Sequence, residues 1–136
     1  MGFPGLETKT HMMLVAGPDT TVPVPVRLYY LTTDPYAVQF TFDVAPDEVV
    51  RWTFARELLD QGMVGPAGMG DVKITPIGDN HARTRIVLES PEGLACLEGA
   101  TAPLKAWLDS TYKEVPAGHE PSAVDIDSLL DELLAH

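Results

Sequence analysis

The strongest constraint on the fold of this chain is a strict alternation of side chains that begins directly after the dipeptide Asp34-Pro35. On an extended backbone the alternation separates two sets, Tyr36, Val38, Phe40 and Phe42 on one side and Ala37, Gln39, Thr41 and Asp43 on the other. A period of two predicts a β-strand with one buried face. The turn fixes where this strand begins, and the register then decides which aromatic side chains face the core.

Other segments of the first half also favour strands. They lie at 6–16, 22–31 and 49–54. Together with 36–44 they predict a four-stranded antiparallel meander, because short turns separate each strand from the next. Pro23 and Pro25 lack a backbone N–H, so the beginning of the second strand should lie at a sheet edge or enter the sheet as an extended segment.

The apolar spacing becomes helical over residues 54–62, and Gly62 is expected just beyond the end of that helix. The segments that follow are a glycine-rich loop at 65–70, a hairpin of strands at 71–77 and 82–90, and a segment at 94–99 that fits either a short strand or the start of a helix. The second half therefore returns to strands before it turns helical.

A helix is predicted over 100–115, with Thr101 as its N-cap. Its apolar face consists of Leu104, Trp107, Leu108 and Tyr112. Residues 116–124 are expected to form an exposed linker to an acidic amphipathic helix at 125–135. The apolar stripe of this last helix is Ile126, Leu129, Leu130, Leu133 and Leu134. The order of elements indicates one α+β domain with an antiparallel majority.

The charge of the chain is strongly acidic, with nine Lys and Arg against twenty Asp and Glu and a net charge of −11. Residues 89–136 hold ten of the acids and only Lys105 and Lys113 as bases. Binding to nucleic acid or to an anionic membrane needs a basic surface, so this balance disfavours both. The single cysteine, Cys96, agrees with a reducing cytosol. No apolar run approaches the ~20 residues of a membrane-spanning helix.

Catalytic and metal-binding patterns are not found in the sequence. The four histidines are scattered one to a region, and Cys96 has apolar neighbours, which is more typical of a core thiol than of a nucleophile. The glycines of 65–70 match neither a phosphate-binding loop nor a dinucleotide fingerprint. The acids of 125–132 lack the calcium-loop pattern and favour a solvated helix face. We therefore expect no enzyme activity, no cofactor and no metal.

Two features could serve binding. The first is the aromatic group of the predicted meander, whose alternate members should be core; because Tyr29 and Tyr30 are adjacent, at least one of them should point away from it. The second is the helix at 125–135, which is too short to be stable alone and must dock on its own domain or on another chain.

Several motifs, taken together and in order, resemble the SsgA-like family of actinomycete sporulation and cell-division regulators. They are the run from Asp34 to Val38, the run from Trp52 to Leu59, the run from Gly70 to Val72, and the turn at 90–93. The resemblance covers about residues 11–135, and the turn at 90–93 is closest to the SsgB branch. Residues 1–10 are expected to be a variable extension.

The resemblance implies a non-enzymatic adaptor that recruits the tubulin-like GTPase FtsZ to septum sites and promotes its assembly there, together with an SsgA-type paralogue. It also implies two antiparallel sheets with helices, similar to the whirly single-stranded nucleic-acid-binding proteins, assembled as a homotrimer. The location expected is the cytoplasm, concentrated at the septum, with the membrane reached only through division partners. Single-stranded nucleic-acid binding is the alternative function, although the charge argues against it.

Candidate partner-binding or assembly residues come from the meander and the last helix. They are Tyr30, Tyr36, Arg51, Trp52, Arg56, Leu129, Leu130 and Leu133. Arg51 and Arg56 are the charged candidates, and for each the alternative is pairing with a neighbouring carboxylate. Charge reversal of Arg56 is expected to alter partner binding without unfolding the protein.

Overall fold

A computed structural model describes residues 5–68 and 70–123. Its strands are β1 (Gly5–Gly17), β2 (Thr20–Leu31), β3 (Ala37–Ala45), β4 (Glu48–Ala55), β5 (Val72–Ile77), β6 (Arg83–Ser90) and β7 (Gly93–Ala100). Its helices are α1 (Arg56–Gly62), the 3-10 turn η1 (Asp79–His81), α2 (Thr101–Glu114) and the short α3 (Glu120–Ala123). The segment at 94–99 is thus a strand, which resolves the open alternative.

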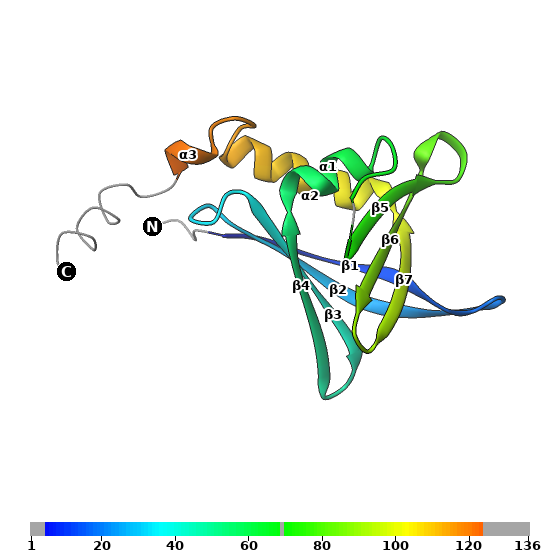
Figure 1. Cartoon of the computed structure of the whole chain (residues 1–136). Coiled ribbons are helices and arrows are strands. Elements are labelled where there is room, and N and C mark those ends of the chain that lie inside the picture. The colour runs from blue at the N-terminus through cyan, green and yellow to red at the C-terminus, as the bar shows by residue number, and fades with distance from the viewer. Residues whose placement is uncertain (1–4, 69, 124–136) are drawn as a thin grey trace.

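The strands form one curled antiparallel sheet in the order β4-β3-β2-β1-β7-β6-β5, with α1 and α2 on one side of it (Figure 1). The predicted meander of β1–β4 is confirmed. The prediction of two separate sheets is wrong, because β1 pairs with β7 through Met13–Glu98 and Leu14–Leu97 and joins the two halves. A likeness to the whirly fold stays a prediction.

The start of β2 behaves as its prolines predict. Its ladder with β3 covers only Val26 to Tyr29, so Pro23 and Pro25 pair on the β1 side alone. Residues 5–10, expected to belong to a variable extension, are part of β1 and pair along β2. The second strand is therefore an edge at its beginning and central at its end.

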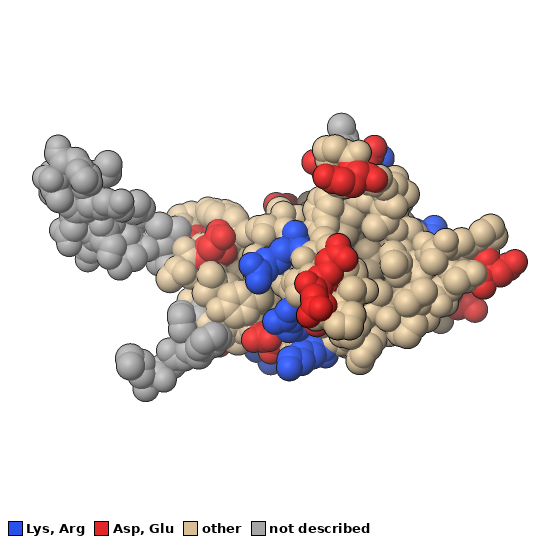
Figure 2. Space-filling model, turned by 90° about the horizontal axis from the view of Figure 1, so that it is seen from below, with Lys and Arg blue, Asp and Glu red and all other residues tan. Residues whose placement is uncertain are grey.

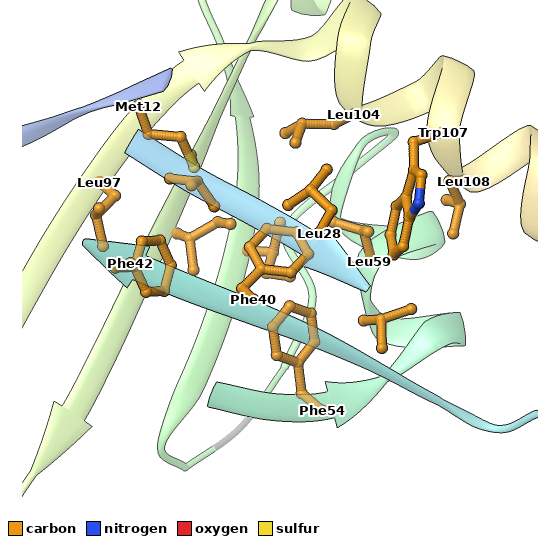
Figure 3. Close-up of a cluster of buried hydrophobic side chains, with 14 of the residues drawn as sticks. Met12, Leu28, Phe40, Phe42, Phe54, Leu59, Leu97, Leu104, Trp107 and Leu108 are labelled. Atoms are coloured by element: carbon orange, nitrogen blue, oxygen red, sulfur yellow. The ribbon is translucent and has the colours of Figure 1, made fainter. Parts of the chain in front are cut away.

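The core lies between the curled sheet and α2 (Figure 3). Of the set predicted to face the core, Val38, Phe40 and Phe42 are buried, but Tyr36 is exposed; Thr41 of the opposite set is buried as well. Phe40 lies at the centre, with its ring centroid 5.1 Å from Phe54 and 6.4 Å from Trp107. The predicted apolar face of α2 supplies Leu104, Trp107 and Leu108 to this cluster, with Tyr112 packed at its margin.

Two predicted helix boundaries are wrong, each for a tertiary reason. Gly62 lies inside α1, and a Cβ at this position would collide with the Ile74 side chain of β5, so the glycine permits close packing. Thr101 is the first residue of α2 and does not cap it; its hydroxyl pairs at 2.7 Å with that of Thr84 on β6. Both residues hold a helix against the second half of the sheet.

Candidate functional site

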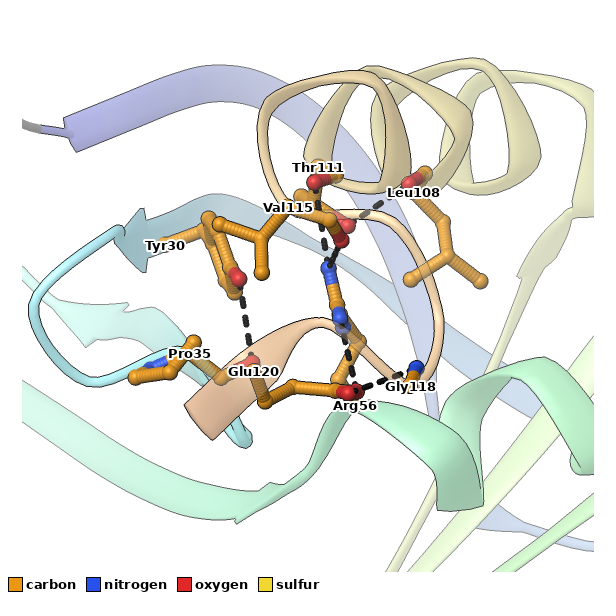
Figure 4. Close-up of polar contacts among 8 residues, drawn as sticks. All are labelled: Tyr30, Pro35, Arg56, Leu108, Thr111, Val115, Gly118 and Glu120. Carbon is orange, nitrogen blue, oxygen red and sulfur yellow. Dashed lines mark hydrogen bonds and ion pairs between the residues drawn. The ribbon is translucent and has the colours of Figure 1, made fainter. Parts of the chain in front are cut away.

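A buried arginine marks the place where the end of β4 meets the last turn of α2. Arg56 is the first residue of α1, and only 1% of it is exposed. Its neighbours come from three distant parts of the chain, Tyr30 of β2, Tyr112 and Val115 at the end of α2, and Glu120 of α3 (Figure 4). We call Arg56 and these partners, with Thr111, the Arg56 centre.

The guanidinium group closes the C-terminal end of α2. Its Nη1 donates to the carbonyl oxygens of Thr111, at 3.0 Å, and Val115, at 2.8 Å. The last carbonyls of a helix have no partner within the helix and carry its negative dipole end, so a cation is favourable there. The side chain that begins α1 thus caps α2.

Two tyrosine rings flank the same cation. The guanidinium carbon lies 5.1 Å from the ring centroid of Tyr30 and 4.0 Å from that of Tyr112, distances at which the ring faces attract a positive charge. Burial raises the pKa of both phenols, although the charge of Arg56 opposes this. Both tyrosines therefore stay neutral at physiological pH.

Glu120 completes the centre. Its Oε2 accepts from Arg56 Nη2 at 3.1 Å, and its Oε1 accepts from the backbone N–H of Gly118 at 2.7 Å. Hydrogen bonds from its own backbone N–H, from Arg56 and from Gly118 lower the pKa of the Glu120 carboxyl, against the opposing effect of burial. Pro116 to His119 are exposed as expected of a linker, but the Glu120 pair ties this segment to the domain.

The Asp34-Pro35 turn is fastened to the centre from both sides. The hydroxyl of Tyr30 donates to the Pro35 carbonyl at 3.0 Å, and the Tyr36 carbonyl accepts from the Arg56 backbone N–H at 2.7 Å. These bonds explain in physical terms why β3 begins where it does. They also leave the Tyr36 side chain outside, 55% exposed.

Tyr36 stands beside an open groove of about 490 Å³. Its lining includes Tyr36, Glu57, Asp60, Tyr112 and Glu120. The groove thus has acidic side chains and an exposed aromatic ring at its surface, and the buried Arg56 in its lining. Such a surface suits contact with another molecule.

The structure separates the predicted site residues into groups. Tyr30 and Arg56 come together in the buried centre, and their role in partner binding or assembly stays a prediction. For Arg56, the alternative of pairing with a carboxylate is confirmed. Trp52 is half-buried on the core side of β4, whereas Arg51 is exposed on the opposite side. Leu129, Leu130 and Leu133 lie outside the described residues.

Sequence reasoning missed Tyr112 and Glu120 as partners of Arg56. The sequence places Tyr112 on the core face of its helix and Glu120 in the linker. The one available signal is that Glu120 is an acid shortly after a predicted helix end. Because Arg56 and Glu120 are 64 positions apart, the sequence does not show that they pair.

The arrangement suits holding the fold together, because Arg56, Tyr30 and Glu120 make their hydrogen bonds with other groups of the protein. Burial raises the pKa of the Cys96 thiol, which disfavours the reactive thiolate. Over residues 5–68 and 70–123, His, Cys, Asp and Glu side chains do not gather in groups of three suited to a metal ion. In the same part of the chain, the helices are too short or too polar to cross a membrane.

Comparison with known proteins shows which family and which relatives this chain is similar to. The family described as Streptomyces sporulation and cell division protein, SsgA, matches residues 24–120. The sporulation-specific cell division protein SsgB of Streptomyces coelicolor is 42% identical over 127 residues, which cover 92% of each chain. The SsgB protein of Thermobifida fusca is also 42% identical, over 91% of each chain.

Two solved structures are similar to this chain. The crystal structure of an SsgA-like sporulation-specific cell division protein from Thermobifida fusca superposes with a TM-score of 0.85 at 38% identity, over 97% of this chain and 98% of that one. A structure reported with SsgB mutations that correlate to longitudinal cell division in Streptomyces coelicolor gives 0.83 at 39% identity, over 88% and 94%.

Proposed function

The chain belongs to the SsgA family of sporulation and cell division proteins, and we propose that it is a non-enzymatic adaptor that recruits FtsZ to septum sites and promotes its assembly there. The observation that carries the proposal is the match to SsgB proteins over nearly the whole chain. The Arg56 centre supports it, since its polar groups are used in holding the fold together.

The proposal includes an SsgA-type paralogue as second partner, assembly as a homotrimer, and a cytoplasmic location concentrated at the septum. It also includes the whirly-like character of the fold. The exposed ring of Tyr36 beside the acidic groove is the surface that we assign to contact with a division partner. Exposed aromatic side chains beside a hollow are typical anchors of protein interfaces.

Co-sedimentation with FtsZ polymers tests the adaptor function. We expect the purified protein to pellet with polymers and to increase their assembly, and Tyr36→Ser to weaken both effects. Val64→Ser is the matched control, because Val64 is 73% exposed and lies away from the groove lining. If the protein leaves FtsZ assembly unchanged even with the SsgA-type paralogue present, the adaptor function is wrong.

Light scattering tests the assembly. A chain that ends after Ala123 keeps the Arg56–Glu120 pair, so it should fold as the full chain does. A trimer in both chains supports assembly through the described domain. A trimer in the full chain alone assigns assembly to residues 124–136, and a monomer in both contradicts the trimer.

A further inference from the structure

Three of the nine basic side chains of this acidic protein lie in one line across β1–β4. The register places Lys9 opposite Arg27, Arg27 opposite Thr41, and Thr41 opposite Arg51. Directly opposed residues of antiparallel strands project to the same face. Leu28, next to Arg27, is buried in the core, so the line projects from the other face, away from the helices. We call Lys9, Arg27 and Arg51 the basic row.

The basic row is accessible and retains hydrogen-bond donors. Lys9 and Arg51 are exposed. Arg27 is 39% exposed at its side chain and donates from Nη2 to Asp43 at 3.2 Å, while its buried Nε has no acceptor among the described residues. Figure 2 looks onto this side of the sheet, and basic side chains form a band across it.

Hollows border the row on both sides. One, of about 400 Å³, is lined in part by Lys9, His11, Pro25, Arg27 and Asp43. The other, of about 110 Å³, is lined in part by Tyr29, Gln39 and Thr53. A ligand that lies along the basic row can therefore place side chains in the hollow on either side of it.

The dimensions of the row fit a short extended peptide. Lys9 and Arg51 are separated by three interstrand spacings, about 14 Å in all. Carboxylates at positions i, i+2 and i+4 of an extended chain span about the same length, at roughly 7 Å per two residues. An arginine fork binds a carboxylate through paired N–H donors, so the exposed guanidinium of Arg51 suits this ligand.

The surroundings of the row favour a peptide over nucleic acid. Acidic residues bound the row, with Glu7 beside Lys9 on β1, Asp43 on β3, and Asp47 and Glu48 at the β3–β4 turn. A long polyanion would have to pass these acids on a protein of net charge −11. A segment with two or three carboxylates lies along the three bases, and the acid nearest to it is Asp43, the ion-pair partner of Arg27.

We propose that the basic row binds an acidic, extended peptide segment of a partner protein, with its carboxylates on Lys9, Arg27 and Arg51. Charge complementarity and the matching length carry the assignment. The site goes beyond the proposed adaptor function, and it does not depend on FtsZ being the partner.

Fluorescence anisotropy with a labelled peptide of alternating glycine and glutamate tests the site in the full chain. The row variant carries Lys9→Gln, Arg27→Gln and Arg51→Gln. The matched variant carries Lys73→Gln, Lys105→Gln and Lys113→Gln, exposed lysines outside the row, and it loses the same charge. We expect the row variant to bind about tenfold more weakly and the matched variant less than about twofold more weakly than the wild type. Binding should weaken as salt is added.

Several outcomes overturn the proposal. The proposal is wrong if the wild-type protein does not bind the glutamate peptide, or if a glycine–glutamine peptide binds equally well. It is also wrong if the two variants lose the same amount of affinity for the glutamate peptide. Row-dependent displacement of the peptide by oligothymidine would assign the row to nucleic acid instead. Circular dichroism melts check that both variants fold, and if the triple row variant unfolds, Arg51→Gln against Lys73→Gln gives the same contrast.

Discussion

The Arg56 centre and the basic row use the same kind of side chain in opposite ways. Arg56 is 1% exposed, and its guanidinium contacts two carbonyls, a carboxylate and two rings. Arg51, on the strand that leads into Arg56, is exposed on the far side of the sheet. A buried cation that donates to groups of its own protein stabilises the fold, whereas an exposed cation with free donors remains available to a partner.

The largest test of this contrast removes the buried cation. Arg56→Leu takes the buried cation away from the Thr111 and Val115 carbonyls and from the Glu120 carboxylate, so we expect a loss of about 3–5 kcal/mol in the free energy of unfolding. Chemical denaturation measures it. Arg56→Lys keeps the charge but not the fork and should restore part of the loss. A loss in Arg56→Leu no larger than in Arg51→Leu would contradict the division between the two regions.

A second test loosens the helix that carries Arg56. Gly62→Ala forces a methyl group into the Ile74 side chain, and we expect a loss of about 1–3 kcal/mol in spite of the better helix propensity of alanine. Gly65→Ala is the matched control, because a Cβ there meets nothing within 4 Å. Thermal melts followed by circular dichroism compare the two, and equal melting temperatures would show that α1 does not need this close contact.

The pH dependence of the Arg56–Glu120 pair gives a smaller effect. Because the pKa of Glu120 is lower in the folded protein than in the unfolded chain, its contribution is full above the unfolded pKa and is lost as the pH falls through the folded pKa. Glu120→Gln should therefore be less stable than the wild type at neutral pH, and the difference should shrink as the pH falls below 4.5, the ordinary pKa of a glutamate. Urea denaturation across this range measures the difference, and a constant difference would exclude the linkage.

The smallest expected effect is on the stability of the basic row itself. Arg51→Gln removes an exposed side chain and should change the free energy of unfolding by less than about 0.5 kcal/mol. Lys73→Gln on β5 is the exposed control. A loss near that of Arg56→Leu would show that the row also holds the fold and would weaken its assignment to binding.

Features with a short period in the sequence were predictable. The burial of Val38, Phe40 and Phe42 and the apolar face of α2 both follow from local spacing, and the buried side chains confirm them. The joining of β1 to β7 was not predictable, since that register depends on residues more than eighty positions apart in the pairs Met13–Glu98 and Leu14–Leu97. The missed Arg56 partners have the same origin, because a local pattern does not show which distant group a buried charge will meet.

The basic row could not be predicted from the sequence for a different reason. Lys9, Arg27 and Arg51 are isolated in the sequence and align only once three strand registers are known. Of the three, only Arg51 is a candidate from the sequence, because it lies close to the family motif. A register shift of one residue in any ladder would send one of these side chains to the core side, so the row is a property of the pairing and not of the composition.

The long separation between Arg56 and its acceptors bears on the order in which the chain is synthesised. Arg56 leaves the ribosome well before Thr111, Val115 and Glu120, which follow it by 55, 59 and 64 positions. Until they arrive, the guanidinium stays hydrated, and Tyr30 and the Asp34-Pro35 turn are not covered. We expect a nascent or prematurely ended chain to remain sensitive to proteases at this junction until the segment from Thr111 to Glu120 has been synthesised and has bound Arg56.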